Sequence, residues 1–77
     1  MDTGDGARTR VFGLKYPIPK DGDSHRIRID VTDQDGTRTV YDEPHNGGET
    51  VKTEVQGVGK PTIRLYDNDA MRYEKTL

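Results

Sequence analysis

Apolar and polar residues alternate along most of this chain, and alternation with a period of two is the pattern of a half-buried β-strand. It is clearest over residues 25–32, where Ile27, Ile29 and Val31 point to one side and the residues between them point to the other. No long run carries apolar residues at helical spacing. The pattern therefore predicts an all-β chain with essentially no helix.

The same pattern predicts further strands on both sides of this one. They are expected at residues 12–18, 37–43, 50–56, 62–67 and 71–75. Pro17 has no N–H for a central strand, so the first of them is expected at a sheet edge. Asp35-Gly36 lies between two strand-like runs and suits the positive φ of a tight turn, which predicts a β-hairpin there.

Six short strands with closely spaced turns are typical of an antiparallel β-sandwich or a small barrel. Residues 11–77 are expected to form this single domain. Residues 1–10 are polar, rich in glycine and without periodicity, so they are interpreted as a disordered lead-in or linker. The side chains predicted to point inward are Phe12, Leu14, Tyr16, Ile18, Ile27, Ile29, Val31, Val40, Val51, Val55, Ile63, Leu65 and Met71.

Composition narrows the class of protein further. The chain has 77 residues, of which 29% are apolar and 34% are charged, so it allows one domain with a thin core. It has no cysteine, and therefore neither a disulfide nor a thiolate. A net charge of -2 lacks the basic excess of nucleic-acid-binding proteins. No stretch approaches the roughly 18 apolar residues of a membrane span, so we expect no membrane contact by this chain. We also expect the chain to be a monomer in isolation.

Three acidic turns, at residues 21–23, 33–36 and 67–69, contain residue types that calcium loops also use. An EF-hand loop spreads its ligands over about twelve residues between two helices, and none of these turns has that context. Asp and Asn are also ordinary turn residues, because their side chains accept hydrogen bonds from nearby backbone N–H groups. We predict turn chemistry and no metal site, with a weak calcium site in one turn as the alternative.

The residues able to do nucleophilic or metal chemistry are few. Ser24 is the only serine and adjoins His25, but adjacent residues of a strand point to opposite faces and cannot form a nucleophile–base pair. His25 and His45 are too isolated for a zinc site, and both are expected to be surface histidines. The loop at residues 45–48 lacks the following helix that a phosphate-binding loop needs. The sequence therefore predicts no catalytic residue and no cofactor.

A group of basic and aromatic residues is expected on the outward face of the strands. Arg28, Arg38, Arg64 and Tyr66 are all assigned outward positions, and Arg and Tyr are favoured at recognition surfaces. The alternative is a solvated sheet face on which Arg28 or Arg64 forms cross-strand pairs with acidic residues such as Asp30 or Glu54.

Several segments follow one another in a recognisable order. A His-Arg-Ile-Arg-Ile strand precedes an Asp-Gly hairpin, a Val-Tyr-Asp strand, a loop with His and two glycines, a Gly-Val-Gly-Lys break and an Ile-Arg-Leu-Tyr strand. These are residues 25–29, 35–36, 40–42, 45–48, 57–60 and 63–66. The order resembles the C-terminal extracellular domain of bacterial serine/threonine protein kinases that carry PASTA repeats, and it covers all but the lead-in and the last turn.

The resemblance implies an immunoglobulin-like β-sandwich on the extracellular face of the bacterial membrane, within a larger membrane-anchored protein. No kinase motif is present, so the chain itself is expected to have no enzymatic activity. The implied role is an accessory one, a contribution to sensing of the cell wall, with peptidoglycan fragments or neighbouring PASTA repeats as partners. We expect ligand contacts at Arg28, Tyr41, Arg64 and Tyr66. The alternative function is a structural spacer or adhesion-type module without a ligand of its own.

Overall fold

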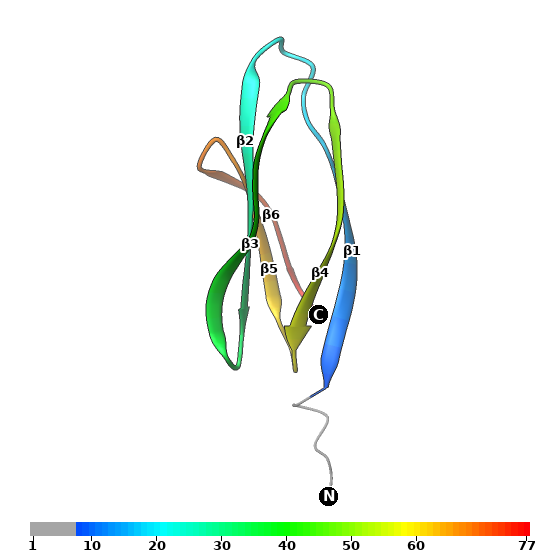
Figure 1. Ribbon diagram of the computed structural model, residues 1–77, viewed down its shortest axis with the longest axis vertical. Helices are drawn as coiled ribbons and strands as arrows, with labels where there is room; N and C mark the ends of the chain where they lie inside the picture. The colour runs from blue at the N-terminus through cyan, green and yellow to red at the C-terminus, as the bar shows by residue number, and fades with distance from the viewer. Residues whose placement is uncertain (1–7) are drawn as a thin grey trace, which may run out of the picture.

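The computed structural model describes residues 8–77, which form six β-strands joined by short turns (Figure 1). The strands are β1 (Thr9–Pro17), β2 (Ser24–Asp33), β3 (Gly36–Asn46), β4 (Thr50–Val58), β5 (Thr62–Asp67) and β6 (Ala70–Thr76). All pairings are antiparallel, in one sheet of order β1–β4 and one of order β3–β2–β5–β6. The predicted all-β class with six antiparallel strands is confirmed.

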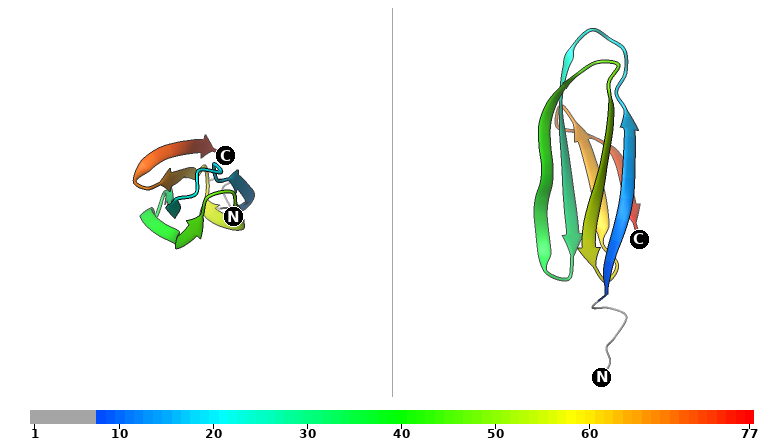
Figure 2. Two further views of the ribbon diagram at one scale, coloured as in Figure 1. Left: turned by 90° about the horizontal axis from the view of Figure 1, so that it is seen from above. Right: turned by 45° about the vertical axis from the view of Figure 1, so that its right-hand side comes forward.

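The two sheets bury one core between them, and the strands surround it when the molecule is seen along its long axis (Figure 2). β2 lies inside the larger sheet, and its inward residues Ile27, Ile29 and Val31 are fully buried. β4 packs against β2 from the smaller sheet. The buried apolar residues are Leu14, Ile18, Ile27, Ile29, Val31, Val51, Val55, Ile63 and Leu65, with Phe12, Tyr16, Tyr41 and Leu77 packed around them.

Two residues predicted to point inward do not, because each lies at a β-bulge. Val40 is 41% exposed: Tyr41 pairs with Ile29 and Thr39 with Asp30, so Val40 is the extra residue of β3. Met71 is 52% exposed and pairs with Tyr66 on the outward face, next to the irregularity in the β5–β6 pairing. A bulge adds a residue to one strand and breaks the alternation of faces, so the prediction for both residues was wrong.

The β2–β3 hairpin forms at the predicted turn, and Gly36 takes a φ of 111° there. The carboxylate of Asp33 accepts hydrogen bonds from the backbone N–H of Asp35 at 2.9 Å and of Val58 at 2.9 Å. These bonds are the main reason why the pKa of Asp33 lies below its ordinary value. This acidic turn therefore fastens the end of β2 to the end of β4.

Both ends of the described chain lie at the same end of an elongated molecule that measures 53 × 18 × 15 Å (Figure 1). The N–H of Gly59 donates to the carbonyl of Arg8, and the N–H of Leu77 donates to the carbonyl of Pro61. β1 begins at Thr9, so Thr9 and Arg10 belong to the sheet rather than to the lead-in. Residues 1–7 of the expected lead-in lie outside the described residues. β1 pairs only with β4, as expected of an edge strand.

Candidate functional site

The opposite end of the molecule, which we call the upper end, consists of the loops at residues 18–23 and 47–49 (Figure 1). The two loops are joined by backbone hydrogen bonds, in which the N–H of Gly47 donates to Asp23 and that of Gly48 to Ile18 and Pro19. A Cβ on Gly47 would lie 2.5 Å from Oδ1 of Asp21, so no larger residue fits without a shift. The two glycines of this loop therefore serve close packing of two loops.

Beneath the upper end lies a partly buried ionic cluster, which we call the His25 network (Tyr16, Asp21, His25 and Asp67), in which His25 and Asp67 are buried and Asp21 is exposed. His25 is only 7% exposed. Its Nδ1 lies 2.6 Å from Oδ1 of Asp67, and its Nε2 lies 2.8 Å from Oδ2 of Asp21. The hydroxyl of Tyr16 donates to Oδ2 of Asp67 at 2.8 Å. Both ring nitrogens face carboxylates, so both are satisfied only when both carry a proton and the ring is an imidazolium.

The pKa values in the His25 network shift as this arrangement requires. The hydrogen bond to Asp21, and then that to Asp67, raise the pKa of His25. The hydrogen bond from His25 in turn lowers the pKa of Asp21. Burial, followed by the bond to Asp67, raises the pKa of Tyr16 to about 12. The network joins β1, the β1–β2 loop, β2 and β5, and it holds the upper end on the core.

The expectation that His25 is a surface histidine was wrong. The sequence contained a signal against it, because the alternation that places Ile27, Ile29 and Val31 inward also places residue 25 inward. A second signal is Asp21, which is close enough to His25 in the sequence to be its partner. No periodic pattern, however, predicts that Asp67 also lies beside His25. The β2–β5 pairing places Asp67 there by setting it opposite Ile27, one inward position from His25.

His45 forms a second, more exposed cluster beside the first. The hydroxyl of Tyr41 lies 2.6 Å from its Nε2, and Oε1 of Glu49 lies 2.8 Å from its Nδ1. A neutral ring with its proton on Nδ1 satisfies both contacts, with Tyr41 donating and Glu49 accepting. The hydrogen bond from His45 lowers the pKa of Glu49, while burial and nearby carboxylates raise the pKa of Tyr41. A tyrosine with a raised pKa is a poor nucleophile.

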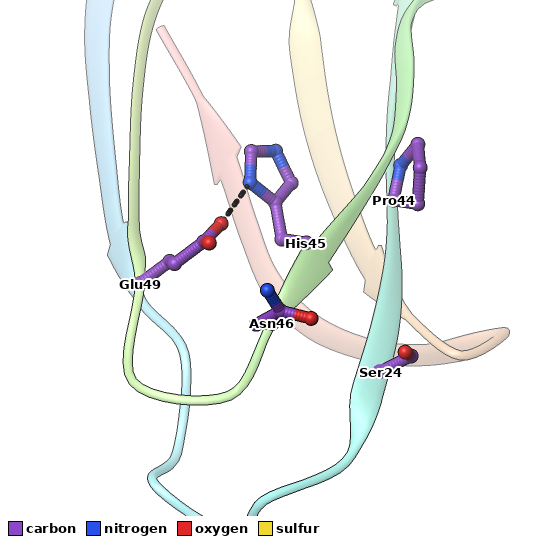
Figure 3. A pocket seen from close by; sticks show the side chains of 5 residues that line it. All are labelled: Ser24, Pro44, His45, Asn46 and Glu49. Carbon is purple, nitrogen blue, oxygen red and sulfur yellow. Dashed lines mark hydrogen bonds and ion pairs between the residues drawn. The ribbon is translucent and has the colours of Figure 1, made fainter.

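A shallow hollow of about 210 Å³ lies next to this second cluster (Figure 3). Its lining consists of Ser24, Pro44, His45, Asn46 and Glu49. Ser24 lies on β2, apart from the His45–Glu49 pair, and no hydrogen bond joins Ser24 to a histidine among the described residues (Figure 3). The hollow therefore contains polar groups without a paired nucleophile and base.

The residues expected to contact a ligand are divided between two faces. Arg28 is opposite Tyr66, and Arg64 is opposite Asp30, so these three expected residues share the outer face of the larger sheet. The Arg28 guanidinium carbon lies 4.4 Å from the centre of the Tyr66 ring. Tyr41 instead lies on the inner face opposite Ile29.

The cross-strand charge pairs expected on the outer face are present in part. Arg28 lies 3.5 Å from Asp30 of its own strand, so this pair is not a cross-strand one. Arg64 does form a cross-strand pair, but with Glu74 of β6, at 2.7 Å. Glu54, the other acidic residue expected there, lies on β4 in the smaller sheet.

Arg38 does not point outward as expected. It is opposite the buried Val31 and donates to the carbonyl of Gln56 on β4 at 3.0 Å. It also forms an ion pair with the side chain of Asp33, at 3.2 Å. The bulge at Val40 changes the face of the residues before it, which explains the difference.

Comparison with known proteins gives no relative: no family model, no curated protein and no solved structure matches this chain. Among residues 8–77, no group of three or more His, Cys, Asp or Glu is arranged to hold a metal ion. No helix of the described chain has the length and apolar character of a membrane span.

Proposed function

We propose that this chain is a non-catalytic, immunoglobulin-like β-sandwich module from the extracellular part of a membrane-anchored bacterial serine/threonine kinase, where it contributes to sensing of the cell wall. The observation that carries this proposal is the position of the chain ends. Arg8 and Leu77 are both held at the β4–β5 turn, by Gly59 and Pro61. The upper end and the sheet faces are therefore clear of both ends of the described chain and are open to a ligand.

The chemistry of the polar side chains supports a role without catalysis. His25 is held by two carboxylates, and His45 is held by Tyr41 and Glu49. A general base needs an unoccupied position toward a substrate. Both histidines use their ring nitrogens to hold the fold, so the module acts by binding.

The outer face of the larger sheet supplies the contact surface in this proposal. Arg64 is held firmly by Glu74, and Arg26 by Asp42 at 2.7 Å. Arg28 makes no hydrogen bond within the described part of the chain, and its ion-pair contacts are longer, 3.5 Å to Asp30 and 3.7 Å to Asp69. A guanidinium that is stacked on Tyr66 and only loosely paired suits the carboxylates of peptidoglycan stem peptides.

The test is an NMR titration of the isotope-labelled domain with soluble peptidoglycan fragments. We expect saturable shifts of the backbone amides around Arg28, Arg64 and Tyr66, and their loss in Arg28→Gln. Arg26→Gln is the matched control, because that arginine is already paired with Asp42. A spectrum that does not move with millimolar fragments would contradict the sensing role.

The alternative function, a spacer without a ligand, is favoured by one observation. The outer face already contains the internal pairs Arg26–Asp42 and Arg64–Glu74. A spacer, however, extends a chain when its ends lie at opposite ends of the module, and here both lie together. The accessory binding role therefore fits the geometry better.

A further inference from the structure

Gly13 lies in the middle of β1 without a structural reason to be glycine. Its φ is outside the left-handed region, and a Cβ added there would meet nothing within 4 Å. The β1–β4 pairing is regular at this point, with Gly13 opposite Glu54 and no bulge. A glycine inside a strand weakens it, and where no bend or bulge explains the glycine, a close approach of a ligand is the remaining common reason.

Next to Gly13, two lysines face each other across the strands. Lys15 and Lys52 are directly opposite, on the outward face of the β1–β4 sheet. Like charges in this position destabilise a strand pair. Among residues 8–77, neither ammonium group makes an ion pair or a hydrogen bond with a side chain. The free protein therefore sets two like charges opposite each other here without a direct ion pair to either.

These two unfavourable features border the same depression in the surface, which we call the Gly13 hollow. It has a volume of about 370 Å³ and is lined by Gly13, Leu14, Lys15, Lys52, Thr53 and Glu54. Leu14 is buried and Thr53 is paired with it, so both side chains lie on the inner face and the strand backbones form the floor. Because Gly13 has no side chain, a flat group of a ligand can lie directly against this floor.

We propose that the Gly13 hollow binds a small ligand that carries a carboxylate or a phosphate on a flat, apolar body. The anionic group lies between the ammonium groups of Lys15 and Lys52 and removes their repulsion. The apolar body rests on the floor at Gly13. This site is on the opposite sheet from Arg28 and does not depend on the proposed function.

Glu54 limits which ligands the site accepts. Glu54 is opposite Gly13, lines the same hollow and is the next outward residue of β4 after Lys52. It accepts hydrogen bonds from an N–H or O–H of the ligand body and repels a second anionic group. The preferred ligand therefore has one anionic end.

The test is a titration of the full chain by NMR with three probes that share one ring: benzoate, phenyl phosphate and the neutral benzamide. We expect saturable shifts of the Gly13, Lys15, Lys52 and Thr53 amides with at least one anionic probe, and none with benzamide. The anion that binds more tightly identifies the ligand group as carboxylate or phosphate. Binding should weaken with added salt, because exposed charges are screened.

Variants separate this site from general attraction of anions. Lys15→Gln and Lys52→Gln should each weaken binding about fivefold, the effect of one exposed charge pair. Lys60→Gln, which removes a lysine outside the hollow, should leave binding unchanged.

Gly13→Val should abolish binding. Both Gly13→Val and Lys52→Glu should raise the Tm, because each removes an unfavourable feature of the free protein.

Three results would overturn the proposal. The first is the absence of shifts with both anionic probes up to about 10 mM. The second is an equal loss of binding in Lys60→Gln and Lys52→Gln. The third is a Tm of Gly13→Val below that of the unaltered chain, which would show that Gly13 serves the fold.

Discussion

At the scale of single residues, His25 shows how a charged side chain is accommodated in a thin core. It follows the inward alternation of β2 and lies beside the apolar residues of that strand. A buried charge is tolerated when it is paired and fully hydrogen-bonded. Asp67, which is 5% exposed, and Asp21 provide that pairing on the two sides of the ring.

Removal of the imidazolium should destabilise the domain strongly. His25→Leu leaves the buried carboxylate of Asp67 with Tyr16 as its remaining side-chain partner, and the Tm should fall by at least about 10 °C. His45→Leu is the matched control and should cost much less, because its partner Glu49 is half exposed to water. Thermal unfolding followed by circular dichroism measures both. Equal Tm values for the two variants would contradict this role of His25.

A second prediction concerns the close contact of the two loops at the upper end. Gly47→Ala places a Cβ 2.5 Å from Oδ1 of Asp21 and 2.8 Å from the carbonyl of Pro19, and should cost about 1–3 kcal/mol of unfolding free energy. Gly13→Ala meets nothing within 4 Å and should be neutral or stabilising. Urea unfolding of the two variants gives the comparison, and an equal effect would contradict the clash.

At the scale of strands, the bulges of β3 and β6 decide which apolar residues reach the core. Ile29 and Val40 are both β-branched apolar residues within strands, yet Ile29 is fully buried and Val40 is 41% exposed. The unpaired position of Val40 in the β2–β3 ladder turns its side chain away from the core. Bulges also interrupt an edge strand and discourage pairing with another chain.

The bulge leads to a testable difference between two apolar truncations. Ile29→Ala should cost about 2–5 kcal/mol, because it opens a cavity at the centre of the core. Val40→Ala should cost less than about 1 kcal/mol, since this side chain is exposed. Denaturant titrations of both variants provide the unfolding free energies. A cost for Val40→Ala equal to that of Ile29→Ala would place Val40 in the core.

The sequence predicted strands well wherever the alternation is unbroken. β2, with its inward residues, and the Asp35-Gly36 hairpin were predicted correctly because both depend on neighbouring residues. The bulge at Val40 was missed because nothing in the neighbouring sequence distinguishes an extra, unpaired β-branched residue from one that continues the strand. The His25 network was missed because Tyr16 and Asp67 are 51 residues apart, and only the sheet pairings bring them together.

At the scale of the whole molecule, long-range pairings join the strands into two sheets. β1 pairs with β4 and β2 with β5, so neither sheet is built from neighbouring strands alone. Turn chemistry identifies hairpins, but it does not determine which distant strands pair. The ends of the sheets are joined by side chains, with Asp33 at the lower end and the His25 network at the upper end. Charged groups thus contribute to the stability of the whole molecule.

Stability should therefore depend on pH at both extremes. The pKa values of Asp21, Asp33 and Glu49 are lowered in the folded state, so their contribution is present above about pH 4 and is lost as the pH falls. The pKa of His25 is raised, so its contribution is complete below about pH 6.5 and is lost as the pH rises through the folded-state value. The pKa of Tyr16 is raised to about 12, so its contribution to stability is also lost as the pH rises above about 10.

The unfolding free energy measured across pH should thus be greatest between about pH 4.5 and 6.5 and should fall on either side. His25→Leu removes most of the decline between neutral and moderately alkaline pH, whereas His45→Leu retains it. A flat profile from pH 6.5 to 9 in the unaltered chain would contradict the pairing of His25 with two carboxylates.

The most direct test of the claim that these polar side chains hold the fold is an NMR titration of the His25 ring, observed through its ring nitrogens and their attached protons. The account predicts a titration midpoint above the ordinary histidine value of about 6.5 and, below that midpoint, protons on both Nδ1 and Nε2 that are protected from solvent. A midpoint at or below 6.5, or a ring that never carries both protons in the folded state, would contradict the account.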